Sequence, residues 1–150
     1  MSLDDLSTEQ QVGLVGAAAV IIGAFLPWFE VSILGTAVTE TGMDRDGWLT
    51  IILAGIAALS IAFTDWDTSH QAVVLVSGAI VALLAAAYVV DPFIFGYEGP
   101  ADQRQLAESA VSVGNGIYLT LIGGLLLVFA AVVSLNESAT DGTGHTPTGD

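Results

Sequence analysis

The stretch Phe25-Leu-Pro-Trp-Phe-Glu-Val31 closes a run of residues without charge that begins at Gln10. Proline disrupts the continuation of a helix, the aromatic rings of Trp28 and Phe29 suit the headgroup zone of a bilayer, and a carboxylate such as Glu30 suits water. We therefore interpret this stretch as the place where a membrane helix leaves the lipid.

Three further windows contain no charged residue: 47–64, 72–90 and 109–136. A bilayer core about 30 Å thick requires roughly 17 to 25 apolar residues per helix, and all four windows meet this length. A soluble bundle would carry a polar stripe at helical spacing, and these windows are apolar all round. The sequence predicts an all-α fold, a membrane four-helix bundle over residues 1–135. The expected spans are about 11–29, 47–64, 72–90 and 113–135.

The segments between the windows predict smaller elements. The residues Val31-Ser-Ile-Leu-Gly35 and Thr36-Ala-Val-Thr39 alternate and are β-branched, which predicts a short β-like hairpin between the first two helices. The S-x-x-Q spacing from Ser7 predicts a capping box, and Pro100 predicts a short interfacial helix within the loop 96–112. Residues 136–150 are rich in Gly, Thr, Ser and Asp, which predicts a disordered acidic tail.

The chain is strongly acidic, because it contains 16 Asp and Glu residues but only 2 Lys and Arg residues, which gives a formal net charge of −14. Crowded acids repel one another unless salt screens them, and at about 1 M salt the Debye length falls to roughly 3 Å. This composition predicts a halophilic membrane protein. It argues against nucleic acid as a partner, since phosphate binding needs clustered Lys and Arg. The N-terminus lacks the basic region of a cleavable signal, so the first helix is expected to stay.

The four windows contain no Asp, Glu, Lys, Arg or His side chain, which argues against proton relays, ion-coupled carriers and intramembrane proteases. The chain has two histidines, His70 and His145, and no cysteine, so neither a metal site nor a hydrolytic triad can be assembled. We therefore expect no catalytic residue, no metal ligand, no cofactor and no enzymatic activity.

Two groups of residues are expected to matter for the membrane. Aromatic residues at the ends of the windows are predicted to anchor the helices at the lipid interface. They are Trp28, Trp48, Trp66, Tyr88 and Tyr97. Small residues that recur every four positions are predicted to let helices approach closely, either inside one bundle or between copies. They include Gly13, Gly23, Gly78, Ala82, Gly116 and Gly124.

Three motifs carry a resemblance to a known group of proteins. They are Leu26-Pro27-Trp28, Asp46-Gly47-Trp48 and Gly114-Asn-Gly-Ile-Tyr-Leu-Thr-Leu-Ile-Gly-Gly124. The chain resembles small four-span membrane proteins of unknown function from haloarchaea and actinobacteria, over most of residues 13–133. Members with an N-terminal zinc ribbon, which this chain lacks, imply cytoplasmic termini. The architecture is also similar to that of the internal membrane proteins of pleomorphic haloarchaeal viruses, which line a lipid vesicle and imply termini in the virion lumen.

These observations predict a structural or protein-interaction role in a halophilic membrane, either cellular or a viral envelope. The expected partners are the lipid bilayer and either copies of the chain or other membrane proteins. The alternative is a subunit of an oligomeric channel or transporter, although selectivity would need polar rings that the spans lack.

Overall fold

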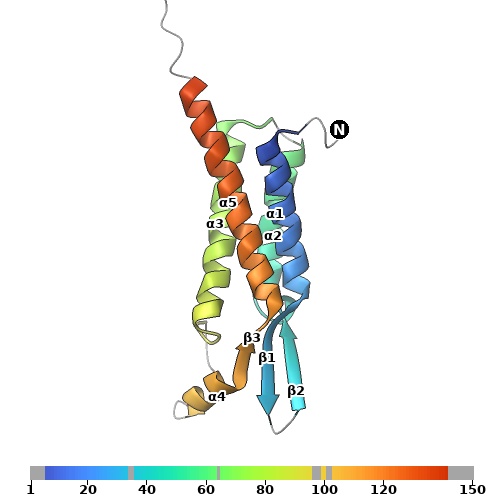
Figure 1. Ribbon diagram of the computed structural model, residues 1–150, viewed down its shortest axis with the longest axis vertical. Helices are drawn as coiled ribbons and strands as arrows, with labels where there is room; N and C mark the ends of the chain where they lie inside the picture. The colour runs from blue at the N-terminus through green and yellow to red at the C-terminus, as the bar shows by residue number, and fades with distance from the viewer. Residues whose placement is uncertain (1–5, 34–35, 64, 96–98, 101–102, 142–150) are drawn as a thin grey trace, which may run out of the picture.

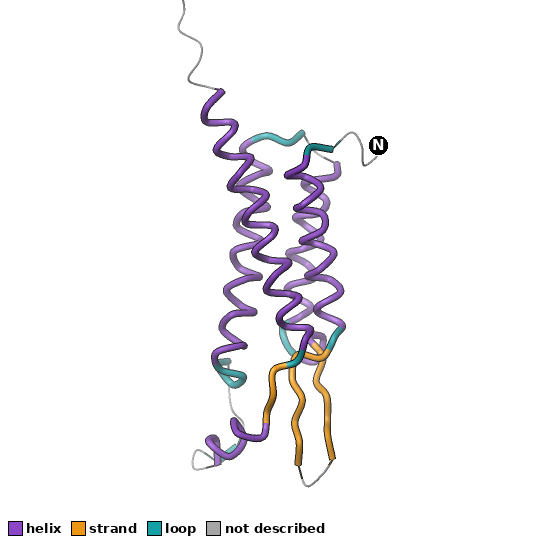
Figure 2. Tube along the Cα trace, viewed as in Figure 1, coloured by secondary structure: helices purple, strands orange, loops and turns teal. Residues whose placement is uncertain are grey.

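The computed structural model describes residues 6–33, 36–63, 65–95, 99–100 and 103–141. Four long helices lie side by side along the long axis, and three strands and a short helix extend beyond one end of them (Figure 1). Figure 2 shows the same division, with all three strands gathered at a single end of the helices. The long helices are α1 (Thr8–Phe25), α2 (Gly47–Phe63), α3 (Thr68–Val90) and α5 (Asn115–Asp141).

Local chemistry sets several helix ends. Ser7 Oγ accepts a hydrogen bond from the Gln10 backbone N–H at 3.3 Å, and Gln10 Oε1 accepts one from the Ser7 N–H at 2.9 Å. The predicted capping box is thereby confirmed. Helix α1 ends at Phe25, two residues before Pro27. Helix α3 begins at Thr68, four residues earlier than predicted, because Asp67 caps it.

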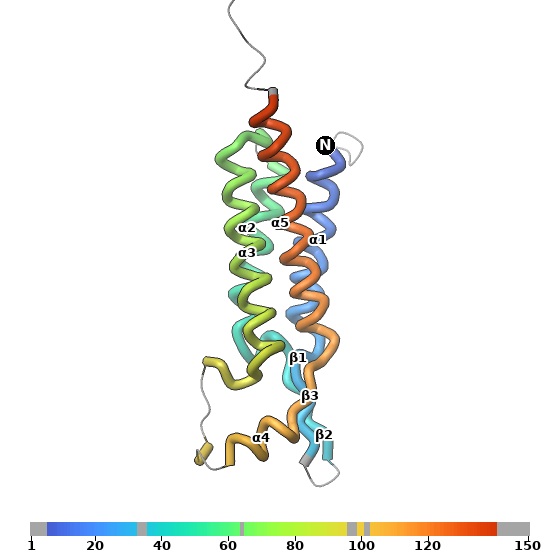
Figure 3. The backbone as a smooth tube through the Cα atoms, turned by 60° about the vertical axis from the view of Figure 1, so that its left-hand side comes forward, coloured from blue at the N-terminus to red at the C-terminus, as the bar shows by residue number. Residues whose placement is uncertain are grey.

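Helix α5 makes the most extensive helix contacts of the bundle, with α1 on one side and α3 on the other. A rotated view shows α5 running beside α1 (Figure 3). Helix α2 packs against α1 and α3 on the other side. The buried core between the four helices includes Val20, Ala57, Ile61, Val81 and Leu127. Small and branched side chains of this kind allow four helices to close around one core.

A three-stranded antiparallel sheet stands at one end, in the order β2-β1-β3. Its strands are β1 (Pro27–Ile33), β2 (Thr36–Thr41) and β3 (Val111–Val113). The hairpin of β1 and β2 confirms the prediction for this loop. The described chain is mostly helical, as predicted, but strand β3 was not predicted, and the helix expected from residue 113 begins two residues later. Val111–Val113 pairs with Phe29–Val31 instead, and α5 begins at Asn115.

Helices α4 and α5 also bear on the predicted boundaries. The short helix α4 (Arg104–Ala110) lies where an interfacial helix was expected, which confirms that prediction. Helix α5 continues to Asp141, so residues 136–141 are helical and not disordered as expected. The hydroxyls of Ser138 and Thr140 donate to carbonyls of the preceding helical turn, those of Ser134 and Asn136, which supports this extension. Residues 142–150 of the predicted tail lie outside the described residues.

Three helices of the described chain are long and apolar enough to cross a membrane, as judged by length and composition. These are α1 with 18 residues, α3 with 23 residues, and α5 over Asn115–Thr140, with mean hydropathies of 1.3, 2.6 and 2.4. Helix α2 is apolar but has only 17 residues. The predicted fourth span therefore stays a prediction.

Candidate binding site

The small sheet has one apolar face and one polar face. Successive side chains of a strand point to opposite sides, so the register decides which residues share a face. The first face is mainly apolar and carries Phe29, Val31, Ile33, Val38, Val111 and Val113, with Thr36 and Glu40 at its edge on β2, and the second carries Glu30, Ser32, Ala37, Thr39 and Ser112. The polar face suits water, whereas the apolar face needs a cover.

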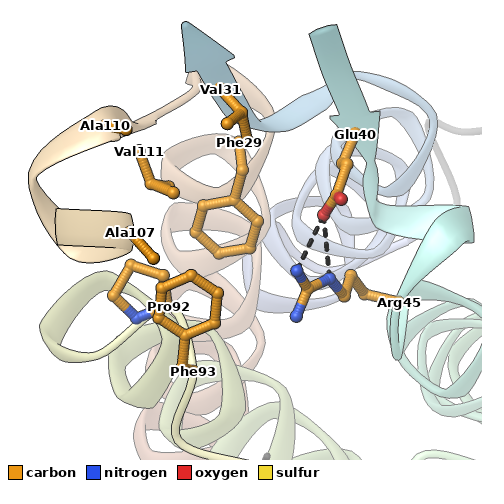
Figure 4. A pocket seen from close by; sticks show the side chains of 9 residues that line it. All are labelled: Phe29, Val31, Glu40, Arg45, Pro92, Phe93, Ala107, Ala110 and Val111. Carbon is orange, nitrogen blue, oxygen red and sulfur yellow. Dashed lines mark hydrogen bonds and ion pairs between the residues drawn. The ribbon is translucent and has the colours of Figure 1, made fainter. Parts of the chain in front are cut away.

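The cover of the apolar face is incomplete. Helix α4 and the segment that follows α3 lie over it, and they leave a cavity of about 220 Å³ (Figure 4). Helix α4 contributes Ala107 and Ala110, whose side chains are too short to reach across the gap. The other lining residues come from the sheet, from the segment after it and from the end of α3. They are Phe29, Val31, Glu40, Arg45, Pro92, Phe93 and Val111.

One wall of the cavity carries an ion pair. Arg45 donates from Nε and Nη2 to Glu40 Oε2, at 2.9 and 2.8 Å (Figure 4). The guanidinium carbon also lies 5.5 Å from the centroid of the Phe29 ring, which is a cation–π contact. The two side chains are 28% and 35% exposed, so the pair adds little net stability. Its main effect is to fix a polar edge beside an otherwise apolar cavity.

A second arginine ties α4 to the bundle. Arg104 Nη2 lies 2.6 Å from Asp91 Oδ2 at the end of α3, and Arg104 Nε lies 2.7 Å from Glu108 Oε1. Hydrogen bonds to Glu108 and then to Asp91 raise the pKa of the Arg104 guanidinium above its ordinary value. The guanidinium therefore stays charged, and this contact positions α4 over the sheet.

Trp28 and Tyr88, two of the predicted interface anchors, are buried in a core cluster together with Phe29. Trp28 is fully buried and donates from Nε1 to the carbonyl of Gly23 at 3.0 Å. Tyr88 is 2% exposed, packs edge-on against Trp28 with ring centroids 5.7 Å apart, and donates from its hydroxyl to Asp46 Oδ2. Because each polar atom has a partner, both rings can be buried in the core instead of lying at the lipid interface.

The remaining predicted anchors have different surroundings. Trp48, at the start of α2, is 52% exposed, and its role as an anchor stays a prediction. Trp66 is partly buried at the opposite end of the bundle, where Nε1 donates to Ser134 Oγ at 3.0 Å. Tyr97 lies outside the described residues.

The structure places the predicted packing residues at contacts between helices. Gly23 of α1 faces Gly116 of α5, and a Cβ built on Gly116 would lie 2.7 Å from the Gly23 carbonyl oxygen. Gly124 of α5 lies against Gly78 and Ala82 of α3 in the same way. Gly13 of α1 lies against the side chain of Ile61 in α2. Absent side chains thus let the backbones of α1, α3 and α5 approach closely.

The opposite end of the bundle holds a second, polar cavity of about 220 Å³. Gln71 is buried there and donates from Nε2 to the Trp66 carbonyl at 3.2 Å. Ser134 and Ser138 line the same cavity, and the Ser138 hydroxyl donates to the Ser134 carbonyl. Within the described residues, no group of three or more His, Asp or Glu side chains could hold a metal ion.

The cavity under the sheet could not be foreseen from the sequence, because its walls come from four distant segments. The one available signal was the alternation in Val111-Ser-Val113, which matches a strand but is only three residues long. The pairing of Glu40 with Arg45 depends on the turn after β2, which joins them over five positions. The chain matches no protein-family model and no curated protein, so the fold and this site carry the functional argument.

Proposed function

We propose that the chain is a non-enzymatic integral membrane protein with a structural or protein-interaction role in a halophilic membrane, either cellular or a viral envelope. The four long helices would lie in the bilayer. The sheet, α4 and the cavity between them would form the part that contacts copies of the chain or other membrane proteins. No cofactor and no nucleic acid are part of the proposal.

The observation that carries the proposal is the apolar outer surface of the bundle. Large apolar side chains point outward from all four helices, where a soluble bundle would carry polar residues. Examples with at least half of their surface exposed are Val15, Ile22, Ile52, Leu59, Phe63, Val76, Leu83, Val90, Ile122, Leu125 and Phe129. Exposed apolar side chains of this kind are unfavourable in water but favourable when they contact the hydrocarbon of a bilayer.

Helix α2 fits the proposal in spite of its length. Its 17 residues extend about 26 Å at a rise of 1.5 Å per residue, which is near the lower limit for a span. Its outward residues Ile52, Ile56 and Leu59 are exposed and apolar. An even number of spans would also agree with the start of α1 and the end of α5, which lie at the same end of the bundle (Figure 1). We propose that this end faces the cytoplasm or the virion lumen.

Membrane association tests the proposal directly. Membranes that contain the protein would be washed with alkaline carbonate and floated on a density gradient. The protein is expected to remain with the lipid, whereas recovery in a detergent-free brine as a single soluble species would contradict the proposal. Protease treatment of sealed vesicles, with a tag after residue 150, would determine the side on which the C-terminus lies.

The alternative, a subunit of an oligomeric channel or transporter, has less support from the bundle interior. The buried hydroxyl of Thr50 donates to Gly47 of its own helix at 2.7 Å, and that of Thr120 donates to Gly116 at 3.0 Å. These groups are satisfied locally and do not form a polar ring. Solute-specific flux across liposomes that contain the purified protein would favour the alternative, and its absence at high salt would favour the structural role.

A further inference from the structure

We propose that the polar cavity at the end of the bundle opposite the sheet binds one divalent cation of the size of Ca²⁺, held by Gln71 Oε1 and by the carboxylates of Glu9 and Glu137. These residues line the cavity from the start of α1, the start of α3 and the end of α5. The cation would therefore join three segments that are far apart in the chain. The inference does not depend on the proposed function, because the protein's own side chains form the site.

The side chain of Gln71 carries the observation on which the site rests. Gln71 is 2% exposed and lines the cavity, and none of the described residues donates a hydrogen bond to its Oε1. Native proteins rarely leave a buried acceptor without a protein group, a water or an ion as its partner. The buried Oε1 is therefore an acceptor that a ligand of the cavity would satisfy.

The nitrogen of the same amide fixes which atom lacks a partner. Gln71 Nε2 donates to the Trp66 carbonyl at 3.2 Å and to Ser138 Oγ at 3.5 Å. If the amide were turned over, Oε1 would lie against the Trp66 carbonyl, and two acceptors would face each other without a proton between them. The atom without a partner is therefore the oxygen, which can accept a hydrogen bond or bind a cation but cannot donate.

The rest of the wall also consists mainly of oxygen atoms. Carboxylates and hydroxyls line the cavity from Ser7, Glu9, Ser134, Glu137 and Ser138. The ring nitrogen of Trp66 is already used, because it donates to Ser134 Oγ at 3.0 Å. An anion would meet two carboxylates in this cavity, whereas a cation would meet oxygen ligands from three segments.

The two carboxylates have no basic partner among the described residues. Both arginines, Arg45 and Arg104, make ion pairs at the sheet end of the bundle, and the chain has no lysine. The nearest histidine in the sequence, His70, contacts the cap of α3 instead. The charge of Glu9 and Glu137 is therefore balanced by ions from solution.

This mixture of ligands suits Ca²⁺ better than Mg²⁺. Ca²⁺ binds about six to eight oxygen atoms of carboxylates, amide carbonyls and waters, at roughly 2.3 to 2.6 Å and in flexible geometry. Mg²⁺ requires nearly ideal octahedral geometry at about 2.0 to 2.1 Å, which side chains from three separate segments are poorly suited to supply. The cavity volume of about 220 Å³ leaves space for the ion and several waters, at roughly 30 Å³ per water.

Two carboxylates make a weak site. We expect a dissociation constant for Ca²⁺ of about 10⁻⁴ to 10⁻³ M, the range of low-affinity calcium modules. The sequence-based expectation of no metal ligand rested on the small number of histidines and the lack of cysteine. The ligands proposed here are oxygen atoms that only the fold brings together.

Calorimetry tests the site with Ca²⁺ itself. The full chain would be titrated with CaCl₂ or MgCl₂ in detergent at about 1 M KCl, where salt screens the diffuse attraction of cations to acidic surfaces. One Ca²⁺ should bind per chain, with Mg²⁺ at least about tenfold weaker. Glu137→Gln and Gln71→Leu should each weaken Ca²⁺ binding at least about tenfold, since even indirect contacts to a metal are worth that much. Glu30→Gln, on the polar face of the sheet, is the matched control and should have no effect.

Two calorimetric results would overturn the proposal. One is the absence of Ca²⁺ binding by the wild-type protein, and the other is equal weakening by Glu137→Gln and Glu30→Gln. Mg²⁺ that binds as tightly as Ca²⁺ would overturn the assignment of the ion. A protein that floats with lipid but binds no Ca²⁺ would contradict the site and leave the proposed function standing.

Terbium luminescence would locate the ion. Tb³⁺ occupies Ca²⁺ sites and emits strongly when a tryptophan close to it is excited. Trp66 lines the cavity, whereas Trp28 and Trp48 lie at the sheet end. We expect emission that Ca²⁺ suppresses, that Trp48→Phe retains and that Trp66→Phe loses. Emission that Trp66→Phe retains, or no emission from the wild-type protein, would overturn the proposed location.

Discussion

Gly116 and Gly55 are both glycines within apolar helices, but their surroundings are opposite. A Cβ on Gly116 would lie 2.7 Å from two backbone oxygens, those of Gly23 and Leu26, which cannot move aside without shifting α1. A Cβ on Gly55 would meet no atom within 4 Å. The same residue type therefore has a packing role in α5 and no packing role in α2.

We predict that Gly116→Ala destabilises the protein by about 1 to 3 kcal/mol, because the added methyl group forces α1 and α5 apart. Gly55→Ala should be neutral or stabilising by about 0.5 to 1 kcal/mol, since alanine is the better helix former. Thermal unfolding in detergent, followed by circular dichroism, would measure both. Equal effects of the two substitutions would mean that the close contact of α1 with α5 does not determine stability.

Among the secondary-structure elements, helix α3 begins at a cap that depends on one carboxylate, that of Asp67. The Asp67 side chain accepts a hydrogen bond from the His70 backbone N–H at 3.0 Å. That bond, followed by the contact with the His70 ring, lowers the pKa of Asp67 below its ordinary value of 3.8. A carboxyl with a lowered pKa stabilises the fold at pH values above its unfolded pKa. Its contribution is lost as the pH falls through the pKa of the folded state.

We therefore predict that Asp67→Ala lowers the unfolding temperature at neutral pH, whereas Asp67→Asn retains most of the cap. The difference between wild type and Asp67→Ala should begin to shrink as the pH falls below about 4, near the unfolded pKa, and disappear once the pH is below the lower pKa of the folded state. Asp65→Ala is the matched control, because its carboxylate does not cap the helix. A difference that persists unchanged at low pH would show that the charged cap is not its cause.

The elements differ in how far the sequence could predict them. The hairpin of β1 and β2 followed from local alternation, because both strands and their turn lie within one short segment. Strand β3 could not, because Val111–Val113 gains its hydrogen bonds from Phe29–Val31, about 80 positions earlier. The burial of Trp28 also depends on tertiary structure, since its ring packs against Tyr88 of α3, about 60 positions later. Local sequence patterns therefore predict most of the helices and the hairpin, whereas the candidate site depends on contacts between residues that are far apart in the chain.

At the scale of the whole molecule, Leu83 distinguishes a membrane bundle from a soluble one. Its side chain is 71% exposed and lies within the most apolar of the candidate spans, α3. At an exposed site in water, a charged substitution usually changes stability by less than about 0.5 kcal/mol. At the centre of a membrane helix, a lysine or arginine costs about 2.5 to 3.5 kcal/mol on insertion scales.

We predict that Leu83→Arg sharply reduces the fraction of the protein that is inserted into membranes. Val38→Arg should not, because Val38 is similarly exposed but lies on the sheet beyond the helices. Glycosylation reporters or carbonate extraction would measure insertion of both variants. Normal folding of Leu83→Arg in the absence of lipid or detergent would mean that the apolar surface faces water.

The charge of the whole molecule determines how salt should act on it. Two arginines make attractive contacts, with Glu40, Asp91 and Glu108, and screening weakens these contacts. Sixteen acidic residues repel one another, and screening weakens that repulsion as well. Because repelling acids far outnumber the attractive pairs, the net effect of added salt should be stabilising.

We predict that the unfolding temperature in a non-ionic detergent rises as KCl increases from about 0.1 to 1 M, over which the Debye length falls from roughly 10 to 3 Å. Glu30→Gln removes an exposed acid from the polar face of the sheet and should raise the unfolding temperature at low salt more than at high salt. Glu40→Gln instead removes the partner of Arg45 and should lack this benefit. An unfolding temperature that falls with salt would indicate that the few ion pairs, and not the repulsion among acids, dominate the electrostatics of the protein.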